Sequence, residues 1–130
     1  MAAAPVRIER LAKRYTTGTA PITALEEVDL AIAPGALVAI VGPSGSGKST
    51  LLHLVGAMDA ADEGTVRVGQ YEVTALSPAE QVAFRRRIGF VFQRFHLLAA
   101  LTALDNVAAP LLPYKTEFDK QERARELLVT

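Results

Sequence analysis

Two unbroken apolar runs stand out from the hydrophobic pattern along this chain. They cover residues 37–41, with the sequence LVAIV, and residues 88–92, with the sequence IGFVF. Runs of this length without polar alternation are typical of strands buried on both faces of a parallel sheet. Over residues 28–32, apolar residues instead alternate with others, which predicts a strand with one buried face. We therefore expect antiparallel strands first, followed by strands that need parallel neighbours.

Weaker strand signals flank these segments. Apolar positions from Val6 to Leu11 predict a first strand that ends near Tyr15. A loop is expected over residues 16–21, because this stretch contains a glycine and a proline. Residues 65–68 predict another short strand, closed by a glycine turn.

Helical periodicity follows the first buried run. Apolar residues recur there at i, i+3, i+4 and i+7, as expected for one face of a helix, at Leu51, Leu54, Val55 and Met58. Capping residues predict three later helices, which begin after Ser77, Thr102 and Asp119. Ser77 is followed by Pro78 and Glu80, the composition of a capping box.

A glycine-rich motif, GPSGSGKST at residues 42–50, joins the first buried run to this helix. It fits the P-loop pattern G-x-x-x-x-G-K-[ST], and the order strand, loop, helix is the context that the pattern requires. Backbone N–H groups at a helix N-terminus attract phosphate, and glycines permit the backbone angles that such a loop needs. The alternative interpretation is a glycine-rich turn that only caps a helix.

The P-loop pattern predicts a contact for each residue of the motif. Lys48 is expected to reach the β- and γ-phosphates, Ser49 to ligate Mg²⁺, and Thr50 to donate to the α-phosphate. The rest of the loop would wrap the phosphates with its backbone, and consists of Gly42, Pro43, Ser44, Gly45, Ser46 and Gly47.

Composition narrows the class of protein. The chain has 130 residues, a formal net charge of zero, no cysteine and two histidines. Without a basic field, nucleic acid is not expected as a partner. No apolar run approaches the length that crosses a bilayer, and the N-terminus lacks the features of a secretion signal, so a soluble cytoplasmic chain is expected.

With these elements in order, the chain resembles the first half of an ABC transporter ATP-binding subunit. The resemblance rests on Tyr15, on VDLAIAPGALVAIVGPSGSGKSTLLHLVGAMDAADEGTVRVG, and on RRRIGFVFQRFHLL with the following ALTALDNVAAPL. Residues 76–112 are most similar to the lipoprotein-release, macrolide-export and cell-division branch. The resemblance implies an α/β fold, a P-loop NTPase core of the ABC type with an N-terminal antiparallel β subdomain, truncated before the signature helix and the Walker B strand.

The resemblance also implies roles for residues outside the loop. Tyr15 would stack on the adenine ring of ATP, although an aromatic residue at a strand edge also commonly packs on its neighbours. Gln93 would contact Mg²⁺ or the attacking water, and would share the metal with Ser49; the alternative is a polar residue that only ends a strand. The segment from Gln93 to Leu101 would contact a transmembrane permease subunit.

The same resemblance implies three parts: an antiparallel β part at about residues 1–35, the P-loop core at 36–92, and the start of a helical subdomain at 93–130. The signature, the Walker B carboxylate, the catalytic glutamate and the switch histidine of the family are absent from the sequence. A second ATP-binding subunit completes the site in this family. We therefore expect a fragment or natural truncation that binds ATP and Mg²⁺ without meaningful hydrolysis alone, held by the permease at the inner face of the cell membrane.

Two other functions fit the residues. One is a non-catalytic remnant that binds nucleotide weakly or acts only by protein contacts. The other is an unrelated P-loop enzyme, such as a small kinase or GTPase. The order and spacing from Tyr15 to Gln93 and the absence of a guanine-reading N-K-x-D motif argue against the second.

Overall fold

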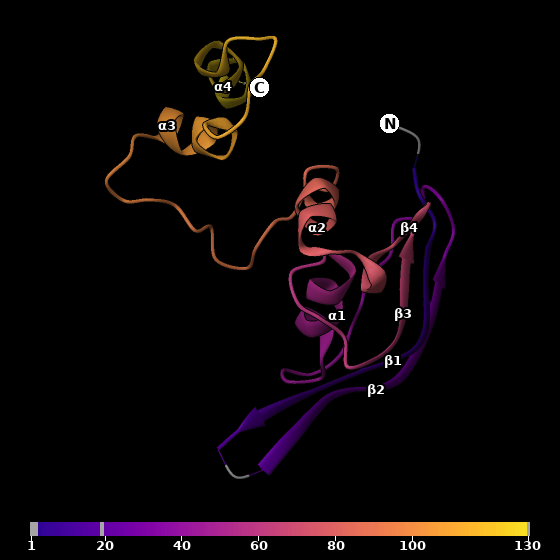
Figure 1. Cartoon of the computed structure of the whole chain (residues 1–130). Helices are drawn as coiled ribbons and strands as arrows, with labels where there is room; N and C mark the ends of the chain where they lie inside the picture. The colour runs from indigo at the N-terminus through magenta and orange to yellow at the C-terminus, as the bar shows by residue number, and fades with distance from the viewer. Residues whose placement is uncertain (1–2, 19, 130) are drawn as a thin grey trace. The chain divides into compact units, whose positions relative to one another are not determined.

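A computed structural model describes residues 3–18 and 20–129 of the chain. It divides into two compact units, Met1–Phe90 and Val91–Thr130, and each is described by itself (Figure 1). The predicted three-part division of the chain stays a prediction.

The first unit is built on an antiparallel sheet. Its strands are β1 (Val6–Thr17), β2 (Ala20–Ile32), β3 (Glu63–Val68) and β4 (Tyr71–Glu72), in the order β2-β1-β3-β4. β1 and β2 form a long curved hairpin (Figure 1). The predicted loop at residues 16–21 is wrong, because Thr16 pairs with Pro21 and Thr17 with Ala20. A much shorter turn suffices, since Gly18 adopts a left-handed φ of 68°.

One extra residue interrupts β1. Between the pairs Ile8↔Leu30 and Leu11↔Val28, β1 has one residue more than β2, and its pairing with β3 shifts in the same place. Arg10 lies in this bulge with a φ of 46°, and its N–H donates to the Asp29 carboxylate at 2.8 Å. Because side chains alternate along a strand, the extra residue puts Leu11 on the same buried face as Ile8.

Helices of the first unit pack on this sheet. They are α1 (Lys48–Val55), the 3₁₀ turn η1 (Val73–Ala75) and α2 (Pro78–Arg85). The capping box predicted at Ser77 is confirmed, since Ser77 and Glu80 cap each other. Leu54 of α1 and Phe84 of α2 are each 2% exposed, and they share one apolar cluster with Val66 of β3, which is fully buried.

The two strands predicted from unbroken apolar runs are wrong. Among the described residues, neither 37–41 nor 88–92 is in a strand, and neither enters the sheet. Leu37 is fully exposed at 103% and Val91 at 95%. A parallel strand exists only where neighbouring strands satisfy its N–H and C=O groups, and the described strands pair elsewhere.

The second unit contains α3 (Ala103–Ala108), the 3₁₀ turn η2 (Ala109–Leu111) and α4 (Lys120–Val129). The predicted caps are confirmed, because Thr102 accepts from the N–H of Asp105 and Asp119 from the N–H of Glu122. α3 and α4 pack on each other, with Ala108 on α3 and Ala124 on α4 both buried.

Candidate functional site

The loop at residues 42–50 curls into the start of α1. Gly45 and Gly47 adopt left-handed φ values of 81° and 84°. Gly47 caps α1, and no side chain hydrogen-bonds to the cap. The first N–H groups of a helix have no intrahelical acceptor, so this end of α1 offers donors and a positive dipole to an anion.

Gly47 also joins the loop to the hairpin. A Cβ built on Gly47 would collide with the backbone oxygen of Ala24 and would lie 2.8 Å from Cδ2 of Leu25, both on β2. Left-handed φ and close backbone approach together restrict this position to glycine. The Gly47 end of the loop is therefore held against β2.

Lys48 turns its ammonium back over the loop. Nζ donates to the carbonyl oxygens of Gly42 at 2.9 Å and Pro43 at 2.6 Å, and to Oγ of Ser46 at 3.1 Å. These weak, exposed acceptors keep the positive charge at the loop, where a phosphate oxygen is a stronger, charge-assisted acceptor.

A pocket of about 250 Å³ opens between the hairpin and this loop. It is close to the range of about 300–1,000 Å³ typical of small-molecule sites. Its lining combines an aromatic and apolar side on the hairpin with a polar, cationic side on the loop, and consists of Tyr15, Ile22, Thr23, Ala24, Gly45, Ser46, Gly47, Lys48, Ser49 and Thr50.

The structure brings Tyr15 together with the second half of the motif. Gly42 and Pro43 lie outside the pocket lining and contribute carbonyls to Lys48, while Ser44 is exposed at the loop. Gln93 belongs to the second unit and is exposed there. The expected roles of these residues in binding nucleotide and metal stay predictions.

Sequence reasoning missed the β2 side of the pocket, residues 22–24. The predicted loop at 16–21 hid them, because Ile22 pairs directly with Tyr15 in the hairpin. If Tyr15 had been assumed to lie in an antiparallel hairpin with a tight turn, the residues opposite it would have been predicted to be near the pocket.

Among the described residues, no group of three or more histidine, cysteine or acidic side chains is placed to hold a metal ion. The pocket fits Mg²⁺ in another way, because its lining at the start of α1 includes Ser49, a residue whose hydroxyl can ligate the ion. Mg²⁺ usually takes few protein ligands and completes its shell with phosphate oxygens and water.

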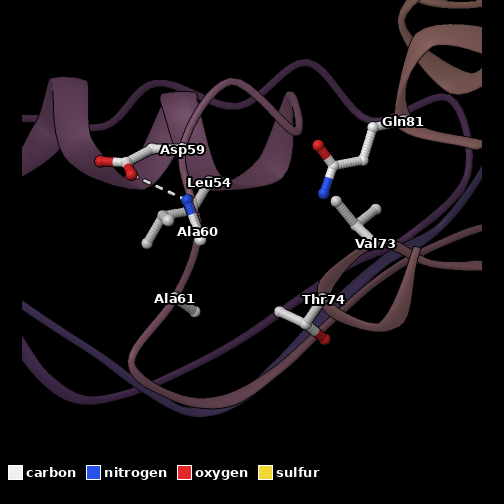
Figure 2. A pocket seen from close by; sticks show the side chains of 7 residues that line it. All are labelled: Leu54, Asp59, Ala60, Ala61, Val73, Thr74 and Gln81. Atoms are coloured by element: carbon white, nitrogen blue, oxygen red, sulfur yellow. Dashed lines mark hydrogen bonds between the residues drawn. The ribbon is translucent and has the colours of Figure 1, made fainter. Parts of the chain in front are cut away.

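A second cavity lies beside the first helix, lined by Leu54, Asp59, Ala60, Ala61, Val73, Thr74 and Gln81 (Figure 2). Its volume of about 50 Å³ exceeds the roughly 30 Å³ that one water occupies. It has room for water and none for a nucleotide, so it is not a candidate for nucleotide binding.

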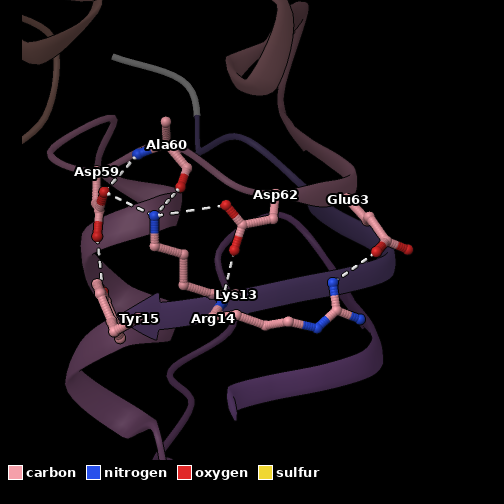
Figure 3. A network of polar contacts seen from close by, with 7 residues as sticks. All are labelled: Lys13, Arg14, Tyr15, Asp59, Ala60, Asp62 and Glu63. Carbon is pink, nitrogen blue, oxygen red and sulfur yellow. Dashed lines mark hydrogen bonds and ion pairs between the residues drawn. The ribbon is translucent and has the colours of Figure 1, made fainter. Parts of the chain in front are cut away.

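Tyr15 belongs to a polar network with Lys13 and Asp59 (Figure 3). Its hydroxyl donates to Oδ2 of Asp59 at 2.7 Å, and this bond, followed by burial, raises the pKa of Tyr15. Burial raises the pKa of Asp59, but hydrogen bonds from Tyr15, Ala60 and Lys13 outweigh that effect and hold the pKa below its ordinary value of 3.8. Asp59 is therefore a carboxylate at neutral pH.

Comparison with known proteins shows which family this sequence matches. The sequence pattern of the ABC transporter family matches residues 25–130. The chain is 46% identical over 127 residues to the lipoprotein-releasing system ATP-binding protein LolD of Bordetella avium (strain 197N), covering 96% of this chain and 55% of that protein. It is 42% identical over 126 residues to the macrolide export ATP-binding/permease protein MacB of Rhodopseudomonas palustris (strain HaA2), covering 96% of this chain and 19% of that protein.

The fold agrees with that of a solved relative. The structure matches the ATP-binding cassette MJ0796, solved as a dimer in a post-hydrolysis state bound to ADP and Pi, with a TM-score of 0.84 and 41% identity. The match covers 93% of this chain and 54% of that chain, and confirms the predicted α/β fold of the ABC type.

Both the LolD relative and the solved cassette extend beyond the matched region. The chain spans about half the length of each of them. Within the described residues, no helix has the length and apolar character needed to cross a membrane. Because the family pattern covers most of the sequence and the fold agrees, the chain belongs to the ABC transporter family.

Proposed function

We propose that this chain is the nucleotide-binding part of an ABC transporter ATP-binding subunit of the LolD or MacB kind, and that it binds ATP with Mg²⁺. One observation carries the proposal: a single pocket has an aromatic ring, Tyr15, on one side and, on the other, Lys48 and the start of α1, whose cap has no side-chain hydrogen bond. A nucleotide has the matching pair of ends, a flat base and a polyphosphate.

The phosphates would lie against the loop. Backbone N–H groups at the start of α1 would donate to them, and Lys48 would exchange the carbonyls of Gly42 and Pro43 for the β- and γ-phosphates. Ser49 would ligate Mg²⁺ and Thr50 would donate to the α-phosphate. Bound Mg²⁺ would neutralise charge on the phosphate oxygens.

The base would lie against the hairpin. Tyr15 is 37% exposed and Ile22 beside it is 55% exposed, so both offer apolar surface to a ligand. An aromatic face stacks on any nucleobase, which supports nucleotide binding with little discrimination between adenine and guanine.

Hydrolysis and transport would need groups from outside this pocket. Phosphoryl transfer to water requires a residue that orients or activates the water, and the lining of the described pocket contains no carboxylate. We propose that Gln93 is one such contact and that a second ATP-binding subunit supplies others. The exposed segment from Gln93 to Leu101, with Phe95 86% exposed, would contact a permease subunit and so place the chain at the inner face of the membrane.

Calorimetric titration of the chain with Mg-ATP tests the proposal. We expect micromolar binding that Lys48→Ala weakens by about 10- to 150-fold, the worth of one hydrogen bond to a charged group. Lys115→Ala is the matched control, because Lys115 is exposed and lies outside the pocket lining, and it should bind like the wild type. Wild-type affinity in Lys48→Ala, or no binding by the wild type, would contradict the proposal.

A phosphate-release assay tests the second part of the proposal. The chain alone should show no turnover above background with Mg-ATP. Turnover that disappears in Lys48→Ala would show that this half of the site is catalytic by itself.

A further inference from the structure

We propose that Asp59, held by Lys13, is a positioning residue that sets the orientation of the Tyr15 ring and so determines how much the base adds to nucleotide affinity. The inference rests on the proposed nucleotide-binding function. It concerns a group of three side chains, Lys13, Tyr15 and Asp59, called here the tyrosine clamp.

The clamp joins two parts of the chain that are far apart in sequence. Lys13 and Tyr15 lie on β1, and Asp59 follows α1 (Figure 3). Nζ of Lys13 donates to Oδ1 of Asp59 at 3.2 Å and to the carbonyl oxygen of Ala60 at 2.6 Å. The Tyr15 hydroxyl donates to the other carboxylate oxygen, Oδ2, at 2.7 Å.

Lys13 gives the clamp its rigidity. It is 9% exposed, and a buried ammonium group is tolerated only when it is paired and hydrogen-bonded. The N–H of Ala60 donates to the same oxygen of Asp59, Oδ1, at 2.7 Å. Because two donors hold Oδ1, the carboxylate has a fixed direction and presents Oδ2 to Tyr15.

The clamp leaves one ring face available. Nζ of Lys13 lies over the Tyr15 ring, 5.0 Å from its centroid, so the ammonium covers one face. Tyr15 is 37% exposed and lines the pocket, so a base would stack on the other face. A ring already held in place loses no rotamer freedom when a base stacks on it. Ordering one side chain on binding is worth about two- to twelvefold in affinity.

The phosphate end of the site contains neither Lys13 nor Asp59, and it meets the clamp only where a side-chain hydrogen bond with Thr50 lowers the pKa of Tyr15. Neither Lys13 nor Asp59 lines the pocket, and Tyr15 is the one clamp residue in its described lining. The structure therefore separates the two ends: loss of the clamp should weaken binding of a nucleotide and leave binding of a bare polyphosphate unchanged. A purely structural role for Asp59 would weaken both.

Calorimetric titration of the full chain with two probes, Mg-ATP and Mg-tripolyphosphate, tests this separation. Tyr15→Phe keeps the ring and the Lys13–Asp59 pair but removes the hydroxyl. We expect Tyr15→Phe and Asp59→Ala each to weaken Mg-ATP binding by about two- to twelvefold, with tripolyphosphate within twofold of the wild type. The double variant should be no weaker than Asp59→Ala alone, because both changes break the same contact.

Two controls make the result decisive. Glu63→Gln changes a nearby carboxylate that pairs with Arg14 and should alter neither affinity. Asp59→Asn keeps an acceptor oxygen and should recover part of the ATP affinity lost in Asp59→Ala. Equal weakening of both probes in Asp59→Ala, or wild-type ATP affinity in Tyr15→Phe, would overturn the inference.

The same titrations separate this inference from the proposed function. If the wild type binds both probes and Lys48→Ala weakens both, the proposed function stands whatever the clamp variants do. If the wild type binds neither probe, the proposed function and the inference fail together.

Discussion

The β1–β2 hairpin and the stretch at residues 37–41 are both rich in apolar residues, yet only the hairpin forms strands. Every residue pair from Val6↔Ile32 to Thr17↔Ala20 is made across a tight turn. Residues 37–41 remain outside the sheet, with Leu37 fully exposed. Antiparallel partners can be joined by a two-residue turn, whereas a parallel partner needs a crossover of a dozen residues or more.

This difference shows which part of the candidate site is determined by elements that the described residues themselves supply. The Tyr15 side depends on the hairpin and on the packing of α1, both of which the described residues supply. The loop at 42–50 is anchored by α1 and by Gly47 against β2, so it forms although the apolar run before it is unpaired. The site is therefore held from the hairpin and helix sides.

Breaking the anchor between loop and hairpin should have the largest effect. Gly47→Val adds left-handed strain and a collision with β2, and we expect it to cost about 2–5 kcal/mol of unfolding free energy and to remove detectable ATP binding. Urea denaturation and calorimetry measure the two effects. Gly45→Val is the matched control, because Gly45 has a similar φ but open space, so strain alone of about 1–2 kcal/mol is expected. Equal losses in the two variants would show that contact with β2 does not matter.

Two leucine substitutions test the difference between the apolar segment that pairs in the sheet and the one that does not. Leu11→Ala removes a fully buried side chain from the sheet and should cost about 2–5 kcal/mol. Leu37→Ala removes a fully exposed one and should change the unfolding free energy by less than about 0.5 kcal/mol. Urea denaturation measures both. A large loss at Leu37 would show that residues 37–41 are packed in solution.

The smallest effect expected in these predictions is the loss of unfolding free energy when acid protonates Asp59 of the clamp. The pKa of Asp59 in the folded chain lies below its ordinary value, so its contribution is present above that value and is lost as the pH falls through the folded pKa. Between about pH 5 and pH 3, the wild type should therefore lose more unfolding free energy than Asp59→Asn, which cannot titrate. Parallel urea titrations across this range measure the difference. If the unfolding free energy falls equally with pH in both proteins, the Asp59 carboxylate is not a source of the pH dependence.

Local chemistry in the sequence was enough to predict much of the fold. The capping residues Ser77, Thr102 and Asp119 act through neighbours three residues away, and the structure confirms all three. The helix predicted directly after the glycine loop is also confirmed, as α1.

What the sequence could not predict depends on distant partners. Apolar runs indicate burial, but pairing decides whether they become strands, and residues 37–41 and 88–92 have no described strand beside them. The bond between Lys13 and Asp59 spans 46 positions, and no local pattern marks either residue. The β2 side of the pocket was missed for the same reason, since only the hairpin register puts Ile22 beside Tyr15.

The single extra residue at Arg10 has a consequence well beyond its own position. Because it reverses the alternation of β1, it puts Leu11 on the side of Ile8, and with it Lys13 and Tyr15, which both reach Asp59 after α1. A one-codon deletion there would turn the Tyr15 ring to the opposite side of β1 while leaving every recognisable motif intact. Sequence searches would score such a gene as unimpaired.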